Sequence, residues 1–232
     1  MTNTENELTL DEIERQTNYL LEFMLSSRAE TLKQCLRNRT KYMTIATENM
    51  FHEHNASAVI RHCDAFGIQS LHTVEKLCPF APSLHITRGS EKWIDIHRHS
   101  STSQLISSLK EEGYRIIATS PHEGGSTPET FDIKKGPFAI VLGTEKTGIS
   151  DEIKKNADEF MAIPMYGLVE SLNVSATAAI ITHILSERIR HEIDNWQLSM
   201  EDYIRLLFKW AKISVQDSSQ ILERYKNTAA DS

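Results

Sequence analysis

The feature that most constrains the fold is the alternation of short apolar segments with helix-like segments between Met43 and Ile163. The helix-like segments end at glycines such as Gly67 and Gly113, as helices often do. Strands that alternate with helices predict an α/β domain with a mainly parallel sheet and helices on both faces. The expected strands cover residues 43–47, 70–74, 92–96, 114–119, 138–143 and 159–164.

The sequence on either side of this alternation has helical spacing. Apolar residues recur at helical intervals over residues 9–38, and a long helix is expected from Asn173 onward. Two more helical segments follow at about 199–212 and 214–227. We therefore predict three parts: an N-terminal helical extension (1–41), a main α/β domain (42–190) and a C-terminal helical extension (191–232).

Composition excludes several classes of protein. No apolar run approaches the roughly 18–20 residues of a membrane span, and the polar, acidic N-terminus is not a secretion signal. We therefore expect a cytoplasmic protein. Cys35, Cys63 and Cys78 are widely spaced, which predicts reduced thiols rather than disulfides or a zinc site.

A metal site is not expected at the histidines that follow the first strand. His52, His54 and His62 lie near Glu53, but they lack the HExxH spacing that brings two histidines to one helix face.

The charge distribution leaves two interpretations open. The formal net charge of −7 disfavours a nucleic-acid partner, because phosphate binding usually requires a basic domain. Basic residues nevertheless gather at 28–41 and, in a smaller cluster, at 188–190. These clusters are either solvated helix faces or a footprint for phosphate.

Three segments that follow predicted strands carry the chemistry, because open α/β sheets build their sites at those strand ends. In TENMFHEHNASAVIRHCDAFG (47–67), Asn55 is placed to start a helix that carries Arg61. In IVLGTEKTGIS (140–150), two glycines bracket Glu145. Each segment alone has an ordinary explanation: an amphipathic helix for the first and a generic loop for the second.

The third segment is IPMYGLVESLNVSATAA (163–179), where Ser171 and Asn173 precede the long helix and could merely cap it. The glycine fingerprints of dinucleotide and phosphate loops, GxGxxG and GxxxxGK[ST], are absent, and so is the GxSxG elbow of hydrolases. The sequence therefore lacks the features of an ordinary Rossmann methyltransferase, kinase or hydrolase.

Together, the three segments resemble the three motifs of the SpoU branch of the SPOUT methyltransferases. The match rests on HNxSAxxR, LGxEKxGIS and IPMxGxVxSLNVS, and it covers about residues 43–190. The resemblance implies a C-terminal deep trefoil knot, S-adenosylmethionine as cofactor, and methyl transfer to an RNA ribose 2′-hydroxyl. It also implies a homodimer in which the first-motif arginine completes the cofactor site of the other subunit.

The resemblance also assigns roles to residues. Arg61 matches the catalytic arginine, either as a base or as a group that binds phosphate and stabilises alkoxide. The second role is chemically easier, because guanidinium is hardly ever deprotonated. Asn55, Glu145, Ser171 and Asn173 match positions that orient substrate and support the site. The implied cofactor positions are Thr119 with its neighbour Ser120, Leu142, Gly143, Ile163, Met165, Ser171 and Leu172.

The short helical N-terminal extension resembles the layout of family members that act on tRNA, which implies the ribose of guanosine 18 in the D-loop as target. The acidic start of the chain departs from that layout. The alternatives are the same chemistry on another tRNA position or on ribosomal RNA, or an inactive knotted RNA-binding protein, which the intact Arg61, Asn55 and Ser171 disfavour. The RNA-binding residues expected from charge are Arg28, Lys33, Arg37, Arg39, Lys41, Arg188 and Arg190.

Overall fold

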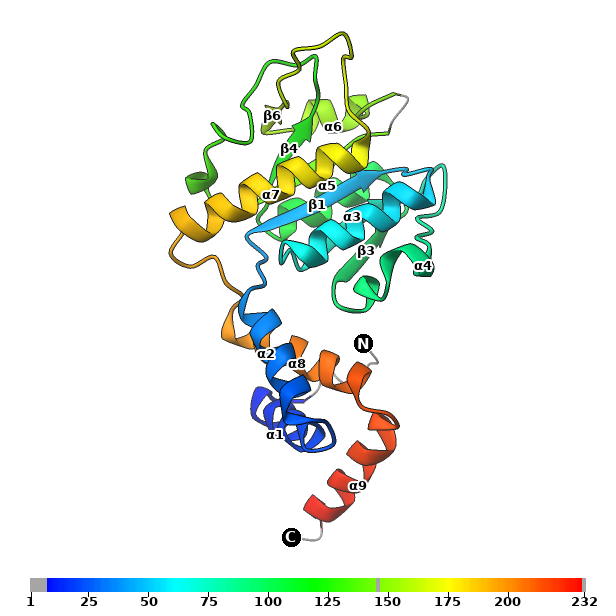
Figure 1. The fold of residues 1–232 in the computed structure, drawn as a ribbon, viewed down its shortest axis with the longest axis vertical. Helices are drawn as coiled ribbons and strands as arrows, with labels where there is room; N and C mark the ends of the chain where they lie inside the picture. The colour runs from blue at the N-terminus through cyan, green and yellow to red at the C-terminus, as the bar shows by residue number, and fades with distance from the viewer. Residues whose placement is uncertain (1–7, 145–146, 231–232) are drawn as a thin grey trace. The chain divides into compact units, whose positions relative to one another are not determined.

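The computed structural model describes residues 8–144 and 147–230, and the chain divides into two compact units (Figure 1). One unit spans Thr40–Trp196 and contains the sheet. The other unit combines the two ends of the chain, up to Arg39 and from Gln197 onward. The two terminal extensions therefore fold together, a pairing that no local sequence pattern indicates.

The sheet unit contains one six-stranded sheet with the order β3-β2-β1-β5-β4-β6. Every strand pair is parallel, which confirms the parallel sheet expected from the sequence. The chain moves outward from β1 in both directions, so the strand order reverses between β1 and β5, where open α/β sheets form crevices. The strands are β1 (Met43–Glu48), β2 (Ser70–Val74), β3 (Asp95–His99), β4 (Arg115–Thr119), β5 (Phe138–Leu142) and β6 (Glu159–Met161).

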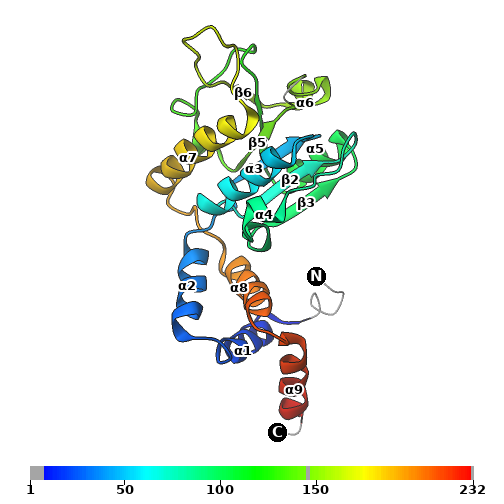
Figure 2. The same cartoon turned by 45° about the vertical axis from the view of Figure 1, so that its right-hand side comes forward.

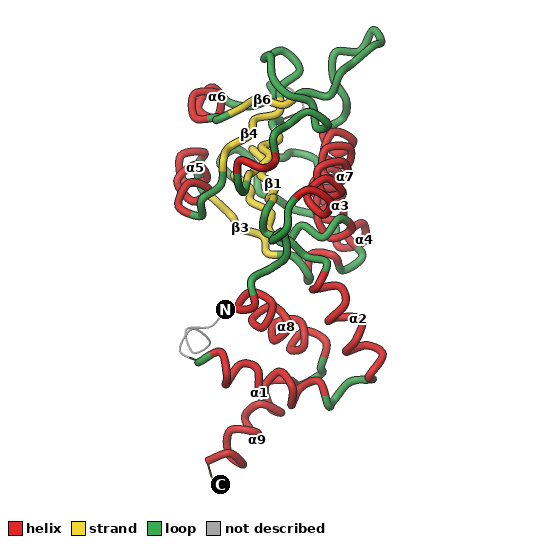
Figure 3. The backbone as a smooth tube through the Cα atoms, turned by 90° about the vertical axis from the view of Figure 1, so that its left-hand side faces the viewer, coloured by secondary structure: helices red, strands yellow, loops and turns green. Residues whose placement is uncertain are grey.

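Helices cover both faces of this sheet (Figure 3). Because side chains alternate along a strand, Phe138, Ile140 and Leu142 of β5 enter one core and Ala139 and Val141 enter the other. The first core includes residues of α3 (Glu53–Ala65) and α7 (Val174–Glu192), which pack side by side on that face (Figure 2). The second core includes residues of α5 (Thr102–Glu111) and α6 (Asp151–Asn156).

Side-chain caps explain why several helices begin where they do. Thr9, Ser101 and Ser150 each accept a hydrogen bond from a backbone N–H in the first turn of α1 (Leu10–Leu21), α5 and α6. Asn173 and Ser199 do the same for α7 and α8 (Met200–Ser214). Each such cap typically contributes about 1 kcal/mol to stability.

The third strand differs from the expectation of 92–96. Residues Ser90–Lys92 form a short 3₁₀ turn (η1), and β3 pairs with β2 only from Asp95 onward. The apolar Trp93 and Ile94 precede the strand rather than form it, and a four-residue helix, α4 (Leu84–Thr87), comes earlier in the connection. The strands expected at 114–119, 138–143 and 159–164 correspond to β4, β5 and β6, although β6 is only three residues long.

The segment at β6 has hydrogen-bonded neighbours on both sides. Ser120 N–H donates to the Met161 carbonyl, Ser126 N–H donates to the Phe160 carbonyl, and the Ser126 carbonyl accepts the Ala162 N–H. A side chain at Gly125 would put its Cβ 2.2 Å from the Phe160 carbonyl oxygen, so this close passage needs glycine. A strand enclosed in this way is compatible with a knot, and the trefoil knot itself stays a prediction.

The helical unit contains α1, α2 (Ser26–Arg37), α8 and α9 (Ser218–Ala230). Its core is a separate cluster from those of the sheet. In the part of the chain that the structure describes, no helix is long and apolar enough to cross a membrane. The buried members of the cluster are Ile13, Leu20, Phe208, Ala211, Val215 and Leu222.

Candidate active site

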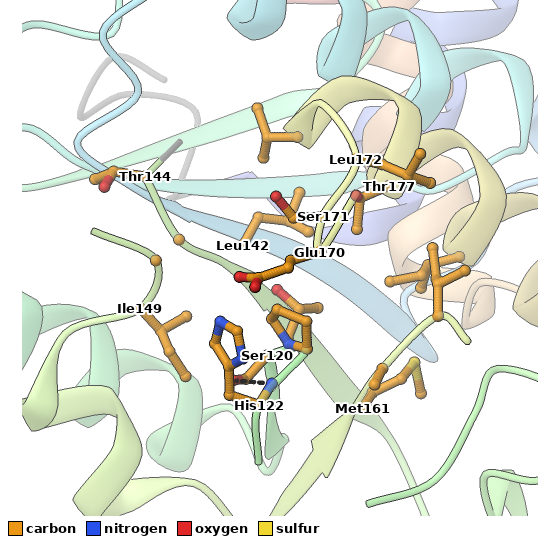
Figure 4. A pocket seen from close by; sticks show the side chains of 18 of the residues that line it. Ser120, His122, Leu142, Thr144, Ile149, Met161, Glu170, Ser171, Leu172 and Thr177 are labelled. Atoms are coloured by element: carbon orange, nitrogen blue, oxygen red, sulfur yellow. Dashed lines mark hydrogen bonds between the residues drawn. The ribbon is translucent and has the colours of Figure 1, made fainter. Parts of the chain in front are cut away.

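A cavity of about 600 Å³ lies at the carboxyl ends of β4, β5 and β6 (Figure 4). Three stretches of chain supply most of its lining: the end of β4 with the residues just after it, the end of β5 with the loop that follows, and the segment that runs from β6 into the first turns of α7. The residues that the family resemblance assigned to the cofactor all line this one cavity. They are Thr119, Leu142, Gly143, Ile163, Met165, Ser171 and Leu172.

The loop after β5 folds back on itself. Thr144 and Gly148 exchange both backbone hydrogen bonds, and the hydroxyls of Thr144 and Thr147 lie 2.7 Å apart. A Cβ at Gly143 would lie 2.2 Å from the carbonyl carbon of Gly148, so glycine is required for this close approach. Glu145, which the sequence predicted to support the site, lies outside the described residues.

The segment between β6 and α7 is exposed on its outer side and ends in a cap. Tyr166 and Leu168 are almost fully exposed, at 96% and 104% of their reference areas. Asn173 accepts hydrogen bonds from the Ser175 N–H and hydroxyl and therefore caps α7. Ser171 lies two residues before this cap, so the capped helix fixes the direction in which the third motif enters the cavity.

Asn55 connects the first motif to the third. Its side chain is buried in the first turn of α3, and its Oδ1 accepts a hydrogen bond from Asn173 Nδ2 at 3.3 Å. Ser57 holds the same end of the helix, because its hydroxyl donates to the Glu53 carbonyl and accepts from Ser83 N–H. The structure thus brings Asn55, Asn173 and Ser171 to one region.

Arg61 is placed differently. It lies on the exposed side of α3, where its Nη1 donates to the Ile86 carbonyl at 3.4 Å. It is not among the residues that line the cavity of its own chain. The structure therefore does not bring Arg61 together with the predicted cofactor residues in a single chain.

Other residues of the cavity were not expected from the sequence. Figure 4 shows Glu170 and His122 projecting toward the same part of the cavity from different segments. Ser120 organises the turn that carries His122, because its hydroxyl accepts the N–H groups of His122 and Glu123. A search of the residues just after β4 would have found His122, whereas Glu170 stands at a position that the motif IPMxGxVxSLNVS leaves unspecified.

A second, smaller cavity of about 290 Å³ adjoins the first. The two share Gly143, Thr144 and Val174, so the loop after β5 forms a wall between them. The remaining lining comes from residues 49–52, which join β1 to α3. The loop after β5 thus separates the segment that leads to Arg61 from the larger cavity.

Of the histidines near the first motif, His52 and His54 are exposed and His62 is half-buried. Burial lowers the pKa of His62, and its hydrogen bond with the Ser175 backbone opposes that effect. His54 and Glu53 are both exposed, 3.9 Å apart. Among the described residues, no group of three or more His, Cys, Asp or Glu side chains is arranged to hold a metal ion.

Three of the arginines expected to bind RNA are engaged inside the protein instead. Arg39 is only 4% exposed and its guanidinium lies over the ring of Trp210 at 5.1 Å. Arg188 donates to the carbonyls of Pro128 and Phe131, both at 2.8 Å. These contacts correct the expectation for Arg39 and Arg188, because a guanidinium that binds backbone carbonyls or is buried does not reach RNA phosphate.

Arg190 needs the same correction. Its guanidinium donates to the carbonyls of Ser186 and Phe66, each at 2.9 Å, and lies over the ring of Trp196. It therefore fastens the end of α7 to the end of α3.

The four cations that precede the sheet keep some access to solvent. Arg28 and Arg37 are exposed, and Lys33 and Lys41 are half-buried. Arg37 pairs with Glu30 at 3.3 Å, with both side chains more than half exposed, so solvent screens this pair strongly. The set that can reach a phosphate group is therefore smaller than the charge pattern suggested.

Comparison with known proteins identifies what this geometry resembles. The model of the SpoU rRNA Methylase family matches residues 42–183. A tRNA (guanosine(18)-2′-O)-methyltransferase from Borreliella burgdorferi is 31% identical over 94% of this chain and 99% of its own length.

Two solved structures are also similar. The Aquifex aeolicus TrmH/SpoU tRNA modifying enzyme superimposes with a TM-score of 0.72 at 32% identity, covering 82% of this chain and 98% of that one. An AdoMet-bound rRNA methyltransferase from Sinorhizobium meliloti has a TM-score of 0.57 at 27% identity, covering 70% of this chain and 61% of that one.

Proposed function

The chain belongs to the SpoU rRNA methylase family, and from this premise we propose that it methylates the ribose 2′-hydroxyl of a tRNA nucleotide, guanosine 18 in the D-loop, with S-adenosylmethionine as methyl donor. One observation carries the proposal: the positions assigned to the cofactor come from three stretches of chain that are far apart in sequence, and they line a single cavity. The relative's specificity for guanosine 18 supports the choice of target.

The cavity's own groups suit this cofactor. The bound cofactor supplies a methyl group already activated by a sulfonium centre, so the protein needs to position groups and manage a proton. Glu170 offers a carboxylate to the cationic part, and the backbone of Gly143 approaches closely because it carries no side chain. A bound AdoMet in the Sinorhizobium relative supports this use of the fold.

Arg61 is the residue we assign to the acceptor. A guanidinium forms paired hydrogen bonds with a phosphate and stabilises negative charge that develops on the ribose oxygen. The Asn55 side chain is buried, so it offers little surface for contact with RNA. Its proposed role is to orient the third motif through its hydrogen bond with Asn173. Glu145 keeps its proposed supporting role from the motif alone.

We also infer a homodimer in which each Arg61 serves the other subunit's cavity. Two observations support it. Arg61 does not line the cavity of its own chain, and α7 has a second face, with Ala176, Ile180 and His183, turned away from the sheet and exposed. Together with the exposed Tyr166 and Leu168, this face offers an apolar surface for a second copy.

The assembly is tested by mixing two inactive chains. Arg61→Ala removes the arginine, and Gly143→Ala forces a Cβ against the Gly148 backbone and disturbs the cavity. A mixed dimer contains one intact pair of cavity and arginine, so random mixing should restore about a quarter of wild-type activity. Sedimentation should give about twice 26.4 kDa. A wild-type monomer that methylates RNA would contradict the dimer.

The reaction is tested with purified components. Calorimetry should detect S-adenosylmethionine at about one site per chain with micromolar affinity, equivalent to about −8 kcal/mol. Methyl transfer should then occur on tRNA transcripts and not on ribosomal RNA fragments. Transfer to ribosomal RNA would favour the alternative substrate. A chain that binds RNA but neither binds S-adenosylmethionine nor transfers a methyl group would favour the inactive RNA-binding protein. The proposed location is the cytoplasm, where tRNA resides.

A further inference from the structure

A buried carboxylate stands where the first two motifs meet. Glu48 is the last residue of β1 and only 3% exposed. Its Oε1 accepts the hydroxyls of Thr102 at 2.7 Å and Ser150 at 2.8 Å, and its Oε2 accepts the Ser150 N–H at 2.9 Å. Neither partner is charged, so this is a carboxylate held by neutral donors.

The chemistry of these contacts fits an ionised side chain. An ionised carboxylate only accepts hydrogen bonds, and all three contacts offer a donor. Thr102 is the first residue of α5, so the carboxylate also lies at the positive end of that helix. A buried charge is tolerated when its hydrogen bonds are satisfied in this way.

Glu48 connects two parts of the site that are far apart in sequence. Ser150 follows Gly148 and Ile149, which line the larger cavity, and it caps α6. On the other side, Asn49 has a left-handed backbone, with φ of 45°, and its side chain accepts the Leu77 N–H. The end of β1 is therefore anchored on both sides just before the chain enters α3.

The anchored loop forms one wall of both cavities. Gly143 and Thr144 line the larger and the smaller cavity, and Thr144 is bonded through its backbone to Gly148, two residues before Ser150. A shift of Ser150 would move Gly148 and, through it, Thr144. The Ser150 contacts of Glu48 are thus the route by which β1 fixes the shape of the cofactor loop.

We propose that Glu48 is a positioning residue for methyl transfer, holding Gly143, Thr144 and Gly148 in the arrangement that binds S-adenosylmethionine. The proposal rests on the proposed function, because it requires the larger cavity to be the cofactor site. The effect of Glu48 passes through Ser150.

The test compares three changes at Glu48 with one control. Glu48→Ala removes every contact, and Glu48→Asp keeps the charge but withdraws the carboxylate by one carbon. Glu48→Gln keeps an oxygen for the Ser150 N–H, and its NH2 group faces the two hydroxyls, which can rotate to accept. Thr102→Val is the matched control, because it removes a hydrogen bond from the same carboxylate without touching the loop.

Two readouts separate positioning from general stability. The first is the Kd for S-adenosylmethionine by calorimetry, at a temperature where every variant is fully folded by circular dichroism. We expect Glu48→Ala and Glu48→Asp to raise this Kd about tenfold, and Glu48→Gln and Thr102→Val to leave it within about threefold. The second is amide hydrogen exchange over residues 147–150 without cofactor, which should accelerate only in the Ala and Asp variants.

Each outcome has a distinct meaning. If Glu48→Ala and Glu48→Asp fold and bind the cofactor as the wild type does, the positioning role is wrong. The role is equally wrong if Thr102→Val raises the Kd as much as they do, because the effect would then be general destabilisation. Loss of binding in Glu48→Gln equal to that in Glu48→Ala would overturn the hydrogen-bond tie. A wild-type chain that binds no cofactor would overturn the proposed function itself.

Discussion

The cavity of the sheet unit and the basic N-terminal segment of the helical unit were both assigned a binding role from sequence, with different results. Around the cavity, positions from three stretches of chain converge, because parallel strands and backbone turns determine where each stretch ends. In the helical unit, Arg39 is buried over Trp210, while Arg28 and Arg37 are exposed. A motif set by backbone geometry fixes a location, whereas charge alone does not.

Substitution of Arg61 should have the largest effect on activity. This residue belongs to a motif yet lies outside the cavity of its own chain, so it tests whether a motif position fixes a functional location. Arg61→Ala should lower kcat by about 10²–10³, equivalent to about 3–4 kcal/mol, while the Kd for S-adenosylmethionine stays unchanged. Arg61→Lys should fail almost as badly, because lysine lacks the planar fork that pairs with phosphate. Single-turnover methyl transfer with saturating tRNA measures both.

Arg15→Ala, which removes an exposed arginine of α1, is the control and should leave the rate unchanged. More than about a tenth of wild-type turnover in Arg61→Ala would show that Arg61 is not the group that stabilises the transition state. Recovery of most activity by lysine would mean that charge, and not geometry, is what the reaction needs.

Acid should distinguish the two units, because all ten histidines lie between Thr40 and Trp196. His72 of β2 is fully buried between His97 and His99 of β3, with both rings stacked against it. Burial, reinforced by these two imidazoles, lowers the pKa of His72 to about 3. Glu112 lies 4.0 Å away and would favour the charged form, but burial outweighs this distant and half-exposed carboxylate.

The sign of the effect follows from linkage. The unfolded chain protonates His72 near pH 6.5, whereas the folded chain does so only near pH 3, so stability is lost as pH falls through this window. Between pH 6.5 and 5 the loss from this one residue should be about 2 kcal/mol. Urea denaturation at the two pH values measures it. His72→Phe should remove most of the difference, and an equal loss in that variant would assign acid sensitivity elsewhere.

The cations of α2 that keep access to solvent give the smallest expected effect. If Arg28 and Lys33 contact phosphate, the double alanine variant should bind tRNA with a shallower slope of log K against log salt concentration. The slope should fall by about one for each lost contact. Arg39→Ala should lower the free energy of unfolding without changing that slope, because its guanidinium is buried. Filter binding at several salt concentrations measures the slopes. An unchanged slope in the double variant would leave Arg28 and Lys33 as solvated surface residues.

The sequence predicted most of the sheet and the lining of the cavity for one physical reason. Buried parallel strands read as short apolar runs, and glycines such as Gly143 mark places where backbone must pass close to backbone. The range expected for the third strand, 92–96, was wrong because the apolar Trp93 and Ile94 give the sequence pattern of a strand. They pack before the edge strand begins, and an edge strand needs few apolar residues.

The residues that sequence reasoning missed act through long-range contacts. Glu48 is an ordinary polar residue at a strand end until Ser150, 102 positions later, folds against it. Arg39 and Arg190 look like surface cations until an indole ring and backbone carbonyls surround them. Such partners are set by tertiary packing, which no local pattern records.

The most direct test of the central claim is methyl transfer to two tRNA transcripts that differ by one oxygen atom. One carries guanosine at position 18, the nucleotide named for the Borreliella relative, and the other carries 2′-deoxyguanosine there. With radiolabelled S-adenosylmethionine and nucleoside analysis by mass spectrometry, we expect one 2′-O-methylguanosine per molecule of the first transcript and no transfer to the second. Equal labelling of both transcripts, or a methyl group on a base, would contradict the account.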